Sequence, residues 1–221
     1  TGNFVVDGGT VKLDGNYPTG TDNVALGDTA LDSTTSGNCN TAIGNHAMTA
    51  NTEGSSNVAV GESALDANTT GSSQVAIGRN ALGANTTSTG NVAVGAFTLL
   101  ANTTGGSNTG LGWQALTANT TASNNTSVGA LSLLANTTGS DNVAVGKSAL
   151  LTNTTGICNT SLGRTSMELN TTGSCNVAVG KDALSNNTTA CNNTAIGFQS
   201  MLANTTGGNN TAVGLCSLYN N

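Results

Sequence analysis

Apolar and polar positions follow one another along this chain in a pattern that repeats every seventeen residues. The repeat is marked by a glycine that recurs without insertion or deletion, at Gly27, Gly44, Gly61, Gly78, Gly95, Gly112, Gly129, Gly146, Gly163, Gly180, Gly197 and Gly214. When each unit is numbered from the residue four places before this glycine, the consensus is N-[VT]-[AS]-[VIL]-G-x-x-[AS]-[LM]-x-x-N-T-T-G-x-x. A fixed period of this kind is typical of an array in which each unit packs against its neighbours.

The length of the unit restricts what each repeat can be. Helical-pair repeats need about 33 residues or more and leucine-rich units need at least about 20, so a shorter unit suits one coil of a β-solenoid. The run "NVAVG" is rich in β-forming residues and closes on glycine, whereas "NTTG" has the chemistry of a turn. Between them, a stretch such as "ESALDA" is either a second short strand or a single helical turn.

We therefore predict an all-β fold, a single β-solenoid (a β-roll or β-helix) of twelve coils that occupies residues 23–221. Residues 1–22 lack the repeat and are expected to form an N-terminal cap or a strand that links subunits. At a coil spacing of about 4.8 Å the rod is on the order of 55 Å long. Coil 12 is incomplete, so either the array continues in a longer chain or another subunit completes it. Coils 1 to 12 begin at residues 23, 40, 57, 74, 91, 108, 125, 142, 159, 176, 193 and 210.

Three positions of the unit predict the core. Position 4 is always Val, Ile or Leu, position 9 is always Leu or Met, and position 3 is always Ala, Ser or Gly. We expect the large side chains at positions 4 and 9 to form buried ladders, and position 3 to have room for a small side chain only. Positions 6, 7 and 10 vary most and are expected to face outward.

Asparagine recurs at positions 1 and 12, and two interpretations of it stay open. Position 12 begins an N-T-T triplet, an acceptor pattern for N-glycosylation, in nine units. The alternative is a ladder of Asn side chains that hydrogen-bond from coil to coil and shape the turn. The ladder is favoured because Asn51 persists where Glu53 breaks the triplet, and because Asn also persists at position 1. The candidate glycosylation sites are Asn68, Asn85, Asn102, Asn119, Asn136, Asn153, Asn170, Asn187 and Asn204.

The variable positions carry large apolar side chains, which predict a contact surface. Leucine is as common there as the aromatic residues, for example at Leu100, Leu134 and Leu151, so we expect a protomer interface ahead of a stacking platform for sugars. The candidate residues of this face are Phe97, Trp113, Leu131, Phe198, Leu215 and Tyr219.

Charge is scarce and unevenly distributed. Only 7% of the residues are charged and the net charge is -6, which disfavours nucleic acid as a partner. Residues 1–66 hold eight acids against one lysine, whereas Lys147, Arg164 and Lys181 repeat at position 6 of three successive coils. The asymmetry predicts head-to-tail association of subunits, although the basic ladder also suits an acidic glycan or a simple solvated face.

Candidate reactive or metal-binding residues are few. Cys158 and Cys175 share position 17 of adjacent coils, which is within disulfide range, but Cys191 competes for the same partner and the total of five leaves one thiol over. His46 is the only histidine, no C-x-x-C pair is present, and no Asp recurs in every unit. We therefore expect no enzyme activity, no metal and no cofactor. No apolar run approaches the roughly 20 residues of a membrane span.

The strand-like runs carry a resemblance to known families. The phrases "NVAVG", "NTAIG" and "QVAIG" resemble the "SVAIG"-type repeats in the head domains of trimeric autotransporter adhesins. The longer phrase that joins "NTAVG" to "NTTG" is similar to repeat arrays in bacteriophage and large-virus tail-fibre proteins. The resemblance covers residues 23–221. It implies a β-roll or β-solenoid fibre segment, often trimeric, on a cell or virion surface, and it assigns no binding residue.

Together these observations predict a non-enzymatic extracellular rod that serves as a spacer or building block of a fibre. Its expected partner is itself, in a homotrimer or a head-to-tail polymer. The alternative is an adhesin or tail-fibre module that binds cell-surface glycans. A minor alternative is an ice-binding solenoid, since Thr recurs at positions 13 and 14 of nearly every coil. Adjacent residues on a strand face opposite ways, however, and this leaves no broad flat face.

Overall fold

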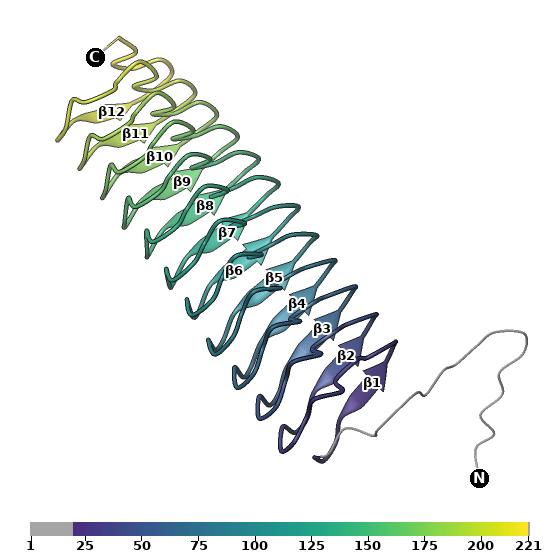
Figure 1. The fold of residues 1–221 in the computed structure, drawn as a ribbon. Helices are drawn as coiled ribbons and strands as arrows, with labels where there is room; N and C mark the ends of the chain where they lie inside the picture. The colour runs from purple at the N-terminus through teal and green to yellow at the C-terminus, as the bar shows by residue number, and fades with distance from the viewer. Residues whose placement is uncertain (1–19, 221) are drawn as a thin grey trace, which may run out of the picture.

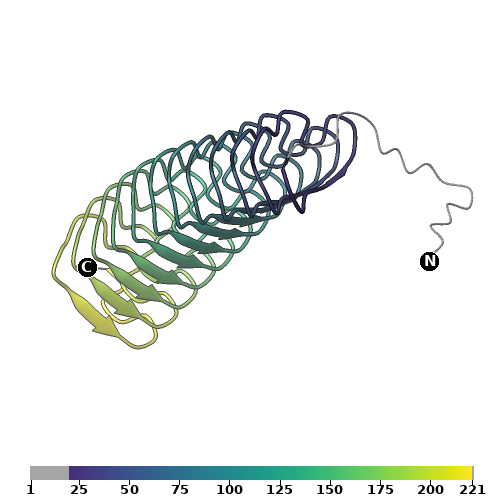
Figure 2. The same ribbon diagram turned by 90° about the horizontal axis from the view of Figure 1, so that it is seen from below.

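The computed structural model describes residues 20–220, which form a straight rod (Figures 1 and 2). The chain winds along the rod as a stack of coils, with one sheet on one side and turns closing the others. Residues 1–19, to which most of the predicted N-terminal segment belongs, and residue 221 lie outside the described residues.

Each coil contributes one three-residue strand to a single parallel sheet. Every strand pairs with the next one along the chain, and the register advances by one repeat at each step, so that Val24 lies beside Thr41 and Thr41 beside Val58. The predicted β-solenoid and its seventeen-residue spacing are therefore confirmed. The strands are β1 (Val24–Leu26), β2 (Thr41–Ile43), β3 (Val58–Val60), β4 (Val75–Ile77), β5 (Val92–Val94), β6 (Thr109–Leu111), β7 (Thr126–Val128), β8 (Val143–Val145), β9 (Thr160–Leu162), β10 (Val177–Val179), β11 (Thr194–Ile196) and β12 (Thr211–Val213).

The rest of each coil consists of turns, so the segment after the glycine is neither a second strand nor a helical turn in the described coils. It still hydrogen-bonds along the rod: the His46 N–H donates to the Asp28 carbonyl of the preceding coil (N···O 3.0 Å), and the Met48 N–H donates to the Ala64 carbonyl of the next (3.0 Å). Positions 7 and 9 have left-handed backbone throughout, with φ of 47° to 59° at position 9. Left-handed residues between right-handed ones turn the chain sharply while their N–H groups stay directed along the rod axis.

The core is a single column of large side chains. Position 9 is fully buried from Leu31 to Met201, as predicted, and it packs between small residues at positions 3 and 8, such as Ala59 and Ala64. The prediction that position 4 is also a core position is wrong. Side chains alternate along a strand, so when position 3 points inward, positions 2 and 4 point outward. Only small residues fit at position 3 because the coil is narrow.

The interior adjusts its volume locally where position 3 or 8 changes. Gly110 occupies position 3 beside Thr98, and a Cβ added to Gly110 would meet the Thr98 Cγ2 at 2.5 Å. In coil 7 both positions are serine, and the hydroxyls of Ser127 and Ser132 hydrogen-bond to each other. In these two places a departure from alanine is balanced by a neighbour, as expected for close packing.

Two leucines of the same coil test this assignment of the core. Leu116→Ala removes a fully buried side chain and should lower the free energy of unfolding by about 2–5 kcal/mol. Leu111→Ala removes a side chain that is 47% exposed and should cost about 1 kcal/mol or less. Urea unfolding followed by circular dichroism, in dilute protein, measures both. Equal losses for the two variants would contradict the assignment.

Candidate interaction surfaces

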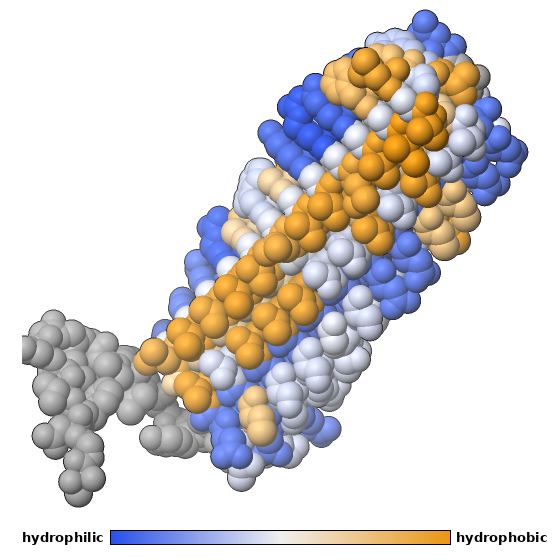
Figure 3. All heavy atoms as spheres, turned by 180° about the vertical axis from the view of Figure 1, so that it is seen from behind, coloured by the Kyte–Doolittle hydropathy of each residue, from blue (hydrophilic) through white to orange (hydrophobic). Residues whose placement is uncertain are grey.

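The outward side chains of the strands form one continuous and largely apolar surface, called the strand face below, in which threonine occupies position 2 of six coils. It consists of positions 2 and 4 of every coil, from Val24 on β1 to Val213 on β12. Figure 3 shows it as an orange stripe along the whole rod. Position 4 is 36% exposed at Ile43, 47% at Leu111 and 66% at Val213. A flat apolar surface of this length is unusual for a protein that stays alone in water.

A row of variable residues, half of them charged, borders the strand face. Position 6 follows each strand by two residues and forms the position-6 ridge. Its two acids lie in coils 1 and 3, Arg79 lies in coil 4, and its other three bases lie in coils 8 to 10. Hydrophilic side chains are visible along that edge of the stripe in Figure 3. The charged members are Asp28, Glu62, Arg79, Lys147, Arg164 and Lys181, and all six are exposed.

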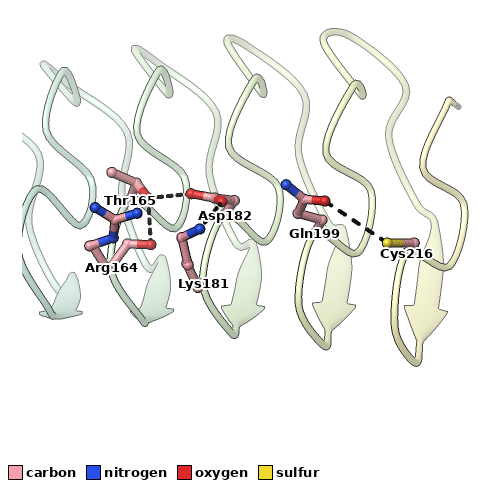
Figure 4. Close-up of polar contacts among 6 residues, drawn as sticks. All are labelled: Arg164, Thr165, Lys181, Asp182, Gln199 and Cys216. Atoms are coloured by element: carbon pink, nitrogen blue, oxygen red, sulfur yellow. Dashed lines mark hydrogen bonds and ion pairs between the residues drawn. The ribbon is translucent and has the colours of Figure 1, made fainter.

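Around Lys181 the ridge is joined to position 7 by polar contacts (Figure 4). The Lys181 ammonium lies 3.2 Å from the Asp182 carboxylate and 5.1 Å from the centroid of the Phe198 ring. Partial burial works to raise the pKa of Asp182, but hydrogen bonds from Thr165 and Lys181, the charge of Lys181 and a bond from Gln199 together lower it. Asp182 therefore stays ionised and holds Lys181 at the edge of the strand face.

The predicted apolar contact residues do not form one cluster. Trp113, Phe198, Leu215 and Tyr219 are exposed, whereas Phe97 and Leu131 are half-buried, and they lie on different coils at positions 6, 7 and 10. The structure brings together instead the outward residues of positions 2 and 4, which the sequence assigned to the core or left aside. Their signal in the sequence was the alternation of apolar residues around an invariably small position 3.

The Asn side chains of position 12 form a buried ladder. From coil 3 onward each side-chain amide donates to the Asn side chain of the preceding coil; Asn119 Nδ2, for example, lies 2.8 Å from Asn102 Oδ1. The same amide donates to the carbonyl three residues on, that of Ala122, at 3.0 Å. Each amide nitrogen thus binds its own turn and the preceding coil.

A second ladder runs through position 1. There the backbone N–H of Asn57 donates to Asn40 Oδ1 (3.0 Å), and Asn40 Nδ2 donates to the carbonyl of Gly54 (2.9 Å). That carbonyl also accepts from Asn51 Nδ2 (3.0 Å), so the two ladders meet at position 15. Every polar atom of these buried amides therefore has a partner.

The burial of position 12 argues against the glycosylation hypothesis. Eight of the nine candidate side chains, Asn68 to Asn187, are 0% exposed, and Asn204 is 1% exposed. A glycan on Nδ2 would replace a hydrogen-bonding proton and would need room that the interior lacks. In the folded coil these residues are structural, and the structure supports the ladder interpretation.

The two threonine columns also differ from each other. The hydroxyls of position 13 donate to the carbonyl of position 13 in the next coil, as from Thr69 to Thr86 (3.1 Å). Position 14 is exposed, as at Thr70 and Thr87. The two columns therefore differ in exposure, and the hydroxyls of position 13 are already engaged in bonds along the rod.

The thiols are free and lie on the outside. Cys158 and Cys175 are exposed neighbours on adjacent coils, and the predicted disulfide between them is not formed. Desolvation first, and then the nearby Cys175 and Asp141, raise the pKa of the Cys158 thiol, so it is protonated at neutral pH.

Residues 20–220 gather no three His, Cys, Asp or Glu side chains that could hold a metal ion. A shallow notch over Gly83, between Asp66 and Leu100, contains no pair of titratable groups. No helix in the described part of the chain is long and apolar enough to cross a membrane. Comparisons with protein-family models, with curated proteins and with solved structures found no match to this chain.

Proposed function

We propose that this protein is a non-enzymatic structural subunit of an extracellular fibre, a stiff rod that associates side by side with copies of itself. The observation that carries the proposal is the strand face. Twelve strands of three residues give a surface of roughly 55 Å by 10 Å, or about 550 Å² on each copy. Two such faces in contact bury about 1,100 Å² in total, which passes the size that separates specific interfaces from incidental ones.

A second copy fits this face better than an unrelated partner does. Its side chains recur at about the 4.8 Å spacing of parallel strands, so an identical face supplies ridges and grooves with the same pitch along the whole rod. Valine, isoleucine, leucine and threonine dominate the face, and its strands carry no charged residue. The stiffness follows from the unbroken register of backbone and Asn ladders.

The other functions suggested by the sequence have less support. Trp113 and Phe198 are exposed but stand five coils apart, which gives no stacking platform for a glycan. The engaged hydroxyls of position 13 leave ice binding without a surface. A homotrimer, a head-to-tail polymer and an extracellular location stay predictions from the sequence.

The lateral association is tested by charging the strand face. Ile77→Lys with Leu111→Lys places two ammonium groups in the apolar stripe and should shift wild-type oligomers to monomers, because desolvating them is costly. The control, Thr87→Lys with Thr121→Lys, adds the same charge to exposed residues of position 14 in the same coils. Sedimentation velocity over a range of protein concentrations measures the result. A wild-type protein that stays monomeric throughout would refute the proposal.

A further inference from the structure

We infer that the second copy packs on the strand face with its rod axis antiparallel to that of the first. The numbers of any two facing coils then add up to eleven, so that coil 1 of one copy faces coil 10 of the other. The inference rests on the lateral association proposed above and adds its direction and register. It follows from the charge order of the position-6 ridge, which runs along one edge of the face only.

Symmetry decides which edges of two facing sheets meet. If the twofold axis runs along the rods, the rods are parallel, the facing strands are antiparallel, and each position-6 ridge lies against the far edge of its partner. If the axis runs along the strands, the rods are antiparallel and the two position-6 ridges lie side by side. Only the second arrangement brings the acids of one ridge to the bases of the other.

The far edge of the face offers the ridge little charge. That edge is formed by position 17, the exposed residue that precedes each strand by two places. Position 17 is mostly Ser, Asn or Cys, and its acids in the described chain are Asp22 and Asp141. In a dimer of parallel rods, Glu62 in the N-terminal half of the rod and Arg164 in the C-terminal half would therefore face no row of opposite charge on the partner. Antiparallel rods match acidic coils 1 and 3 with the basic coils of the partner.

The register follows from the individual charges. When coil numbers sum to eleven, Asp28 of coil 1 faces Lys181 of coil 10, and Glu62 of coil 3 faces Lys147 of coil 8. The twofold axis repeats each pair, so a dimer contains four pairs of opposite charge. Ten of the twelve coils then overlap, so the buried area falls from about 1,100 Å² to about 960 Å² in total, which still exceeds the size of most incidental contacts.

Neighbouring registers are worse because of Arg79. When the coil numbers sum to twelve, Glu62 faces Arg164 but Arg79 faces Lys147. When they sum to thirteen, Glu62 faces Lys181 but Arg79 faces Arg164, so in both registers two repulsions per dimer offset two attractions. A sum of ten keeps Asp28 opposite Arg164 but places Glu62 opposite Ala130. With a sum of eleven, Arg79 faces Ala130 and meets no like charge. Like charges in direct contact discriminate strongly between registers.

Zero-length carbodiimide cross-linking tests the arrangement directly. Glu62 and Lys147 lie five coils apart in one chain, about 24 Å, so a Glu62–Lys147 amide must join two copies. We expect this cross-link and the Asp28–Lys181 cross-link, and an equal mixture of isotopically light and heavy protein should show both as intermolecular. An associated protein that yields neither cross-link overturns the antiparallel register but leaves the lateral association standing. A monomeric protein refutes the proposed function itself.

Charge exchange supplies a second test. Lys147→Glu with Lys181→Glu turns four attractions per dimer into repulsions and should weaken association by about tenfold or more at low salt. Adding Asp28→Lys and Glu62→Lys restores opposite pairs and should recover the affinity. The control Arg79→Glu changes a residue that faces Ala130 and should have a small effect. If the fourfold variant associates no better than the double variant, the register is wrong.

Discussion

Gly112→Ala should break the solenoid near its centre and lower the free energy of unfolding by roughly 3–5 kcal/mol. Gly112 has a φ of +135°, a conformation that side-chain-bearing residues rarely adopt. An added Cβ would lie 2.7 Å from the carbonyl carbon and oxygen of Gly129 in the next coil. Those atoms are backbone and belong to the ladder, so they cannot move aside without separating the coils.

Two other glycines separate the backbone strain from the steric clash with the next coil. Gly214 has a similar φ of +125°, but the nearest atom to its added Cβ is the Ser217 Cβ at 4.0 Å, so Gly214→Ala should show the backbone strain alone, about 1–3 kcal/mol. Gly83 has an ordinary φ and no contact below 3.4 Å, and Gly83→Ala should be nearly neutral. Urea unfolding gives the global values, and hydrogen exchange reports the terminal coil. Equal losses at Gly112 and Gly214 would show that the contact with Gly129 adds nothing to the backbone strain.

The sequence predicts the coil because its strictest positions are set by the backbone and by the packing between coils. Gly112 and its equivalents mark the corner, and Leu116 and its equivalents mark the buried column. Any insertion would shift both out of register with the neighbouring coils. The period therefore follows from stacking itself, and it could be seen without a structure.

Hydrophobicity alone could not show that the side chains at position 4 point outward. Val58 and Val60 point outward, yet both are as apolar as residues of a core, and a three-residue strand is too short for a clear amphipathic pattern. Volume decides instead, since a narrow coil that already holds Leu65 accepts only Ala59 on the inward side of the strand. An apolar strand face is what the proposed lateral association would cover.

Burial of the Asn residues was also beyond the sequence alone. An N-T-T triplet satisfies both a glycosylation pattern and a tight turn; Asn51 favours the ladder, and the position of Asn68 inside the coil supports it. The arrangement of charges around the sheet was likewise beyond the sequence alone. The sequence shows that Glu62 and Lys147 belong to one ridge, but the edge of the sheet that the ridge borders comes from the fold.

Asn119→Asp should be among the most destabilising polar substitutions in the protein, with a loss of about 3–5 kcal/mol at neutral pH. The new oxygen replaces Nδ2, which donates to Asn102 Oδ1 and to the Ala122 carbonyl, so a carboxylate would face two acceptors in a fully buried site. The other oxygen keeps the bond that Asn136 Nδ2 donates at 2.9 Å, which offsets only part of the cost. Replacing the neutral amide thus introduces a buried charge and leaves Asn102 Oδ1 without its donor, while the Ala122 carbonyl keeps only the bond from Asn108 Nδ2.

The pH dependence identifies the cause. Burial and facing acceptors raise the pKa of the new carboxyl above its unfolded value of about 3.9, so the protonated form is the one that the folded coil tolerates. It can donate one proton to Asn102 Oδ1. The variant should therefore be closest to wild type below pH 4 and should lose stability as the pH rises from about 4 through the folded pKa. Urea unfolding of both proteins at several pH values measures the difference.

A matched substitution on the surface separates the ladder from the residue type. Asn209 is exposed at position 17, where Asp141 occurs naturally, and its Oδ1 accepts from Asn192 Nδ2 at 3.3 Å. Asn209→Asp keeps that acceptor in water and should change stability by less than about 0.5 kcal/mol with little pH dependence. If Asn119→Asp behaved in the same way, the position-12 column would not hold the coils together, and the rod's stiffness would have to come from its backbone bonds alone.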